Sequence, residues 1–208
     1  ITHAMRAVND MMYARAEFAR GFGDAPMERL VIVLPPYLEQ YKDWTGREYW
    51  HYSDLRADTM TIQPISTLHK RGLLDIALRH EYYQWALGHF TNYGAPRWME
   101  EGVASHFSRE GVIVEQNAAE FPAEAHDLTI DKIEQALIVE ESKQDTRIAY
   151  YLAHRMVVSL VERYGEEKLV ETLKLMAQGY DTDGAFQKVY GMSYESLRDL
   201  ALGDAKQT

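Results

Sequence analysis

Apolar residues recur at strand spacing only near the start of the chain and at helical spacing elsewhere. Residues 4–20 predict an amphipathic helix that ends near Gly21. The run RLVIVL at 29–34 predicts a short buried strand stopped by two prolines, and TMTIQPI at 59–65 predicts a second strand. Between them, YLEQYKDWTG predicts a short helix ending at Gly46.

From Leu73 onward the pattern is that of helices, with Pro96 suited to the first turn of one of them. Residues 110–127 read as irregular. A few early strands followed by helices favour an α+β fold. We predict one domain over 1–208, with an α/β subdomain at 1–92 and a helical subdomain at 93–208. The helices are predicted at 73–87, 97–108, 131–141, 148–164, 166–177, 184–190 and 194–200.

Composition excludes several classes of function. The formal net charge is −10, which disfavours nucleic-acid partners because phosphate contacts need a basic face. No cysteine is present, so thiol catalysis and thiolate metal sites are absent. No run of about 18 apolar residues predicts a membrane-spanning helix. A cysteine-free chain that begins at Ile1 rather than Met leads us to expect a trimmed, extracytoplasmic protein of the periplasm or cell envelope.

The segment HEYYQ, residues 80–84, carries the main chemical signal. On a helix, His80 and Gln84 share a face, and Glu81 lies about 100° around the axis. With His in place of Gln84, this would be the HExxH signature of zinc hydrolases, in which two ligands hold the metal and the glutamate acts as general base. HExxQ alone is a weak signal, and an amphipathic helix with an incidental His-Glu pair is the competing interpretation.

Five blocks, in order and over nearly the whole chain, strengthen the signal. The chain resembles the peptidase-MA-like proteins, relatives of the gluzincin zinc metallopeptidases. The resemblance implies a zincin-like α+β fold, with a small N-terminal sheet, an active-site helix and a mostly helical C-terminal half. The blocks are MERLVIVLPPYLEQYKDWTG, TMTIQPISTLHKRGLLDIALRHEYYQ, PRWMEEGVASHFS, DLTIDKIEQAL and AYYLAHRMVVSLVERYGEEKLVETLKLMAQGYDTDGAFQKVYGMSYESL.

The resemblance also implies roles for individual residues. His80 matches the first zinc ligand, Glu81 the general base and Glu101, seventeen positions after Gln84, the last ligand. Gln84 stands where the second histidine belongs. The cofactor implied is zinc, and the implied partner is a peptide or protein.

Other residues are candidates for the same cleft. Tyr150 is a candidate for stabilising an oxyanion, with Tyr151 competing and core packing as the alternative for both. His154 and Trp98 are possible cleft residues. Arg97 flanks the second motif and suits either an ion pair on the helix face or a substrate carboxylate.

Gln84 leaves the function open. Its amide oxygen is neutral and hard, and suits calcium or magnesium better than zinc. One interpretation is a zinc-dependent peptidase with a degenerate HExxQ site. The second is an inactive pseudopeptidase that uses the old cleft for binding or scaffolding in the cell envelope. A third is a purely structural domain of a larger envelope protein.

Overall fold

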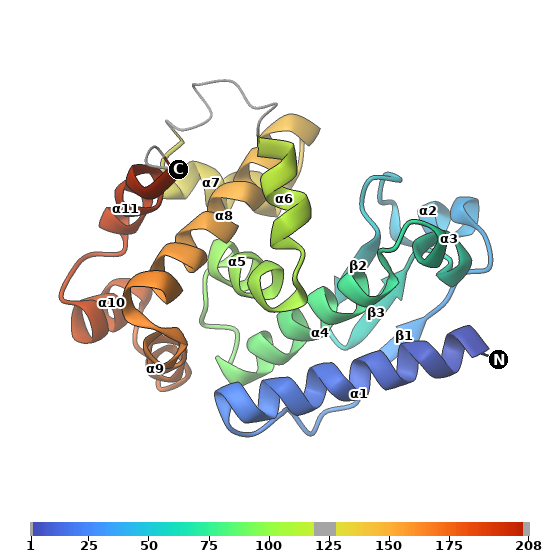
Figure 1. Ribbon diagram of the computed structural model, residues 1–208, viewed down its shortest axis with the longest axis horizontal. Helices are drawn as coiled ribbons and strands as arrows, with labels where there is room; N and C mark the ends of the chain where they lie inside the picture. The colour runs from blue at the N-terminus through green and yellow to red at the C-terminus, as the bar shows by residue number, and fades with distance from the viewer. Residues whose placement is uncertain (1, 119–127, 206–208) are drawn as a thin grey trace. The chain divides into compact units, whose positions relative to one another are not determined.

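The computed structural model describes residues 2–118 and 128–205 (Figure 1). Contacts within the chain define two compact units, Ile1–Ala86 and Leu87–Thr208. The predicted single domain with a boundary after residue 92 stays a prediction. Within the described ranges, no helix is both long enough and apolar enough to cross a membrane.

The first unit combines a small sheet with helices. Strands β1 (Val31–Val33), β2 (Ser53–Arg56) and β3 (Thr59–Ile62) form the sheet in the order β1-β3-β2. β1 pairs with β3 in parallel, and β2 pairs with β3 antiparallel. The helices are α1 (Thr2–Phe22), α2 (Leu38–Thr45), α3 (Ile65–Lys70) and the first part of α4 (Leu74–Phe90).

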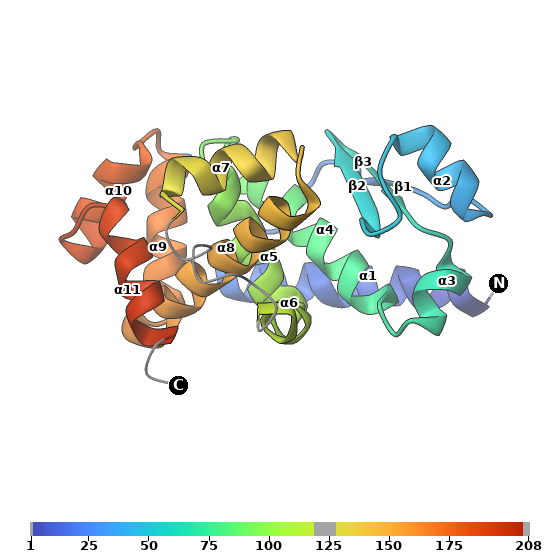
Figure 2. The same cartoon turned by 90° about the horizontal axis from the view of Figure 1, so that it is seen from above.

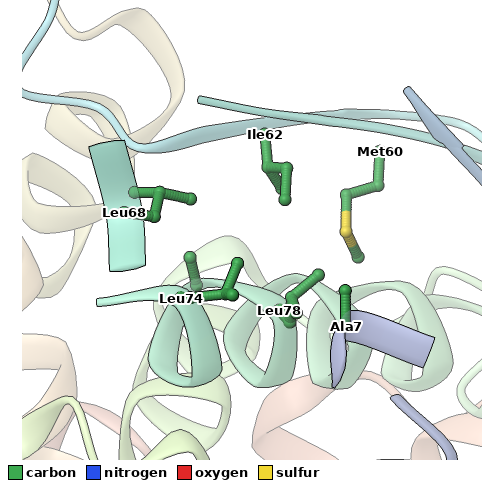
Figure 3. Close-up of a cluster of buried hydrophobic side chains, with 7 residues drawn as sticks. Ala7, Met60, Ile62, Leu68, Leu74 and Leu78 are labelled. Atoms are coloured by element: carbon green, nitrogen blue, oxygen red, sulfur yellow. The ribbon is translucent and has the colours of Figure 1, made fainter. Parts of the chain in front are cut away.

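The core of this unit lies between the sheet and α4. Met60 and Ile62 alternate onto the same face of β3 and point toward Leu74 and Leu78 of α4, as Figure 3 shows. Ala7 of α1 joins the same cluster. Burying these apolar side chains fixes which face of α4 meets the sheet.

The second unit is helical and is built around one long helix. Its elements after α4 are α5 (Arg97–Ser108), α6 (Gly111–Ala118), α7 (Ile130–Val139), α8 (Lys143–Tyr164), α9 (Glu166–Ala177), α10 (Thr182–Tyr190) and α11 (Glu195–Ala205). Helices α5, α6, α7, α9 and α11 all contact α8 (Figure 2). The approach of α5 to α8 requires Gly102, because a Cβ there would lie 2.4 Å from the carbonyl oxygen of Ala153.

The predicted α+β class with a mostly helical second half is confirmed. The sequence prediction missed β2 and α3. It was wrong at Gly111–Ala118, which forms α6 rather than an irregular segment. The rest of that predicted irregular stretch, 119–127, lies outside the described residues.

Candidate functional site

The HEYYQ segment lies on α4 within the first unit. His80, Glu81 and Gln84 are all buried there, each with about the same small exposed fraction of 5–6%. The side-chain nitrogen of Gln84 lies 2.7 Å from Nε2 of His80. The i, i+4 spacing brings the two side chains together as the sequence predicted.

The chemistry of this contact follows from its donors. An amide nitrogen only donates, so in this orientation Nε2 of His80 accepts and the ring proton lies on Nδ1. With the amide turned over, Oε1 of Gln84 would accept from an Nε2–H group. In both orientations Gln84 engages Nε2 of His80.

Glu81 shares its surroundings with Tyr41 of α2 and Asp54 of β2. Tyr41 is fully buried. Burial raises the pKa of its phenol, and the carboxylates of Asp54 and Glu81 raise it further. Tyr41 therefore keeps its proton at neutral pH. Sequence reasoning missed Tyr41, since no local motif marks a tyrosine brought to α4 by a distant helix.

Asp54 forms two ion pairs in the same region. Nε of Arg47 lies 2.6 Å from one of its oxygens, and Nε of Arg56 lies 2.8 Å from the other. Its side chain is 3% exposed, so the two arginines compensate a buried carboxylate.

Glu101 lies on α5 in the second unit. Its side chain is fully buried, and its Oε1 lies 2.6 Å from Nη2 of Arg97 one turn earlier. Nη1 of Arg97 also lies 3.4 Å from Oε2 of Glu100. The ion pair predicted for Arg97 on its own helix is present, and its role toward a substrate carboxylate stays a prediction.

Glu134 of α7 fixes the beginning of α5. Its two carboxylate oxygens accept the backbone N–H groups of Arg97 and Trp98, at 2.8 and 2.9 Å. These are N–H groups that a helix start leaves without an intrahelical partner. The start of α5 therefore gathers three carboxylates: Glu100 and Glu101 pair with the guanidinium of Arg97, and Glu134 accepts from the backbone.

The pKa of Glu100 depends on these surroundings. Burial raises its pKa to about 7; Arg97 opposes the rise, while Glu101 adds to it. A substantial share of Glu100 is consequently protonated at neutral pH.

The other predicted cleft residues have structural partners within the second unit. The hydroxyl of Tyr150 donates to Oε1 of Glu140 at 3.4 Å. His154 is buried, and burial lowers its pKa to about 4, so its ring is neutral. Its ring lies against Gly111, where an added Cβ would fall 2.3 Å from Cε1. Their roles in a cleft stay predictions.

Trp98 is buried and lines a cavity of about 300 Å³ in the second unit. Four carboxylates also line it, each at a helix start or capping one, where negative charge complements the helix dipole. Capping accounts for their presence. The four are Asp131 in the first turn of α7, Glu134 of α7, which caps the start of α5, and Asp181 and Asp183 at the start of α10.

A comparison with protein families supplies the remaining observation. A family model described as Peptidase MA superfamily matches residues 42–202, which is most of the chain. The chain belongs to the peptidase MA superfamily. A search of curated proteins found no match, and neither did a search of solved structures.

Enzymes of the peptidase MA superfamily generally depend on zinc, so the residues present can be tested against that metal. A catalytic zinc site takes three protein ligands, usually nitrogen or carboxylate donors. Among the side chains that the structure describes, no three His, Asp or Glu residues come together in a way that could hold a metal ion. Gln84 is bonded to His80, and Glu101 to Arg97. As arranged, this donor set does not suit zinc, and the assignment of His80, Gln84 and Glu101 as ligands stays a prediction.

Proposed function

We propose that this peptidase MA domain is a pseudopeptidase, which binds a peptide or protein and does not cleave it. One contact carries the proposal: the side-chain amide of Gln84 lies 2.7 Å from Nε2 of His80. The residue at the position of the second histidine is thus bonded to the first ligand.

Two effects of Gln84 act against zinc. Zinc prefers imidazole, and an amide oxygen is a harder and less basic donor. The contact with Nε2 must also be broken or turned over before His80 can bind a metal through that nitrogen. Losing a mere supporting partner of a ligand weakens metal affinity by about 10–100-fold, so losing an imidazole ligand should weaken it more.

The surroundings of the motif are buried and polar. Glu81 and Tyr41 are both buried, the carboxylate of Glu81 raises the pKa of the Tyr41 phenol, and two arginines pair with Asp54. The lack of cysteine supports a place in the periplasm or cell envelope, which we include in the proposal.

A hydrolysis assay tests the proposal. Metal-stripped and zinc-supplemented wild-type protein is incubated with casein and with a pool of fluorogenic peptides, beside Glu81→Gln as the matched control. We expect no cleavage above that of Glu81→Gln in either condition. Zinc-dependent cleavage that Glu81→Gln abolishes would contradict the proposal.

The binding role is tested separately. A peptide-display selection on immobilised wild-type protein, with a chelator present throughout, should enrich ligands. Failure to enrich any peptide would leave the structural-domain alternative as the better account.

A zinc-dependent peptidase is the second candidate, and the same contact favours it in one respect. Gln84 already points at His80, so a half-turn of the amide would present Oε1 beside Nε2. His80, Glu101 and that oxygen would then be the ligands, with Glu81 as the expected base. Cleavage in the hydrolysis assay would select this candidate.

A further inference from the structure

The buried carboxylate of Glu101 needs a positive charge close by. Its side chain is fully buried, and a buried anion without a counter-charge is strongly unfavourable. In a zinc enzyme of this superfamily, the metal would supply that charge. Here Nη2 of Arg97 lies 2.6 Å from Oε1 of Glu101, on the same helix and in the same unit.

The position of Arg97 on its helix is unfavourable for a positive charge. It is the first residue of α5, where the helix dipole disfavours positive charge. Glu134 offsets this by accepting the N–H groups of Arg97 and Trp98. Glu134 fixes the backbone of Arg97, and the side chain then reaches Glu100 and Glu101.

The pair also differs from an ordinary surface pair at i, i+4 spacing. Exposed pairs contribute little because water screens both charges. In this pair Glu101 is 0% exposed while Arg97 is 30% exposed, so the anion depends on the arginine more than on water. This geometry suits a fixed counter-charge for Glu101.

We propose that Arg97 is the fixed counter-charge of Glu101 and takes the electrostatic place of a metal ion on this helix. Arg97 is a positioning residue that fixes the Glu101 carboxylate in one orientation. The inference deepens the proposed function and rests on it where it says that no metal shares Glu101. The ion pair itself can be tested without reference to zinc.

A double-mutant cycle in urea tests the pair. The variants are Arg97→Met, Glu101→Gln and the double variant, compared with wild type. We expect Arg97→Met to raise the equilibrium constant for unfolding by about 10–100-fold, after allowing for the partial exposure of Arg97. The same change in the Glu101→Gln background should have at most a few-fold effect. Arg97→Lys should recover part of the loss, because it keeps the charge but not the bidentate fork.

The exposed pair Lys168 and Glu171 on α9 is the matched control. Its nitrogen–oxygen distance is 2.7 Å, yet its side chains are 46% and 51% exposed. The cycle Lys168→Met with Glu171→Gln should show almost no coupling. If Arg97→Met fails to fold while the double variant folds, the inference is supported. Equal effects of Arg97→Met in both backgrounds, or failure of both variants to fold, would overturn it.

A zinc titration of the wild-type protein separates this inference from the proposed function. Micromolar zinc binding by wild type would overturn the proposed function, whatever the urea cycle shows. Lack of coupling in the urea cycle would overturn the counter-charge role, whatever the zinc titration shows.

Discussion

Gly102 is the position at which one added methyl group should be felt most in the helical unit. It follows Glu101 on α5 and faces α8. An alanine Cβ there would lie 2.4 Å from the carbonyl oxygen of Ala153 and 2.6 Å from Cγ2 of Val157. The side chain of Val157 can rotate, but the carbonyl of Ala153 belongs to the backbone of a helix and cannot turn away.

The magnitude follows from two opposing effects. Overpacking a tight contact costs about 1–3 kcal/mol, and a contact with fixed backbone belongs at the upper end. Replacing glycine by alanine inside a helix returns about 1 kcal/mol. We therefore expect Gly102→Ala to lower the free energy of unfolding by about 2 kcal/mol, which for a chain of this size lowers the melting temperature by roughly 4–8 °C.

Urea denaturation followed by far-UV circular dichroism is the assay, with Gly21→Ala as the matched control. Gly21 lies in α1, and no atom falls within 4 Å of a Cβ added there. Gly21→Ala should leave stability unchanged or raise it by up to about 1 kcal/mol. A Gly102→Ala protein as stable as wild type would refute the reasoning that glycine is needed for the approach of α5 to α8.

Two predictions concern pH. Burial raises the pKa of Glu110 to about 7 from a model-peptide value of 4.5, so its contribution to stability is full below pH 4.5 and is lost as pH rises through 7. Glu110→Gln should therefore be more stable than wild type by about 3 kcal/mol at pH 8 and nearly equal to it at pH 4.5; equal stability at both would refute the shift. His154 has the opposite sign: its pKa falls from 6.5 to about 4, so its contribution is full above pH 6.5 and is lost as pH falls toward 4. His154→Gln should flatten the wild-type loss of stability between pH 6.5 and 4, measured by urea titration at each pH; an unchanged slope would argue against a neutral, buried ring.

Periodicity predicted the elements that are long and amphipathic, because their apolar spacing is decided locally. The helix after Pro96 is of this kind, whereas the helix with His80 is buried on nearly all of its faces. Strand β2, with the sequence SDLR, carries two charged residues in four and has no local signal for a strand. Its place is set by pairing with β3, which is a property of the fold. Helix α6 begins with GVIV, a β-branched run whose local preference is for a strand.

The same division holds for the candidate site. Helical spacing brings Gln84 to His80 and Arg97 to Glu101, and both pairs could be placed from the sequence. The phenol of Tyr41 and the cap from Glu134 reach their partners from other helices, so only the structure reveals them. The sequence also could not predict which partner each predicted metal ligand contacts. Spacing alone does not show whether a neighbouring side chain binds a metal together with that ligand or takes the place of the metal.

Zinc binding to metal-stripped protein, measured by calorimetry with Gln84→His beside wild type, decides whether the HEYYQ helix can hold a metal. We expect no binding by wild type at micromolar zinc and binding of one zinc ion by Gln84→His, because the substitution restores an imidazole and removes the amide from Nε2 of His80. Failure of both to bind would show that the predicted ligands do not surround one centre. Binding of one zinc ion by wild type at micromolar affinity or better would contradict the account and establish Gln84 as part of a working metal site.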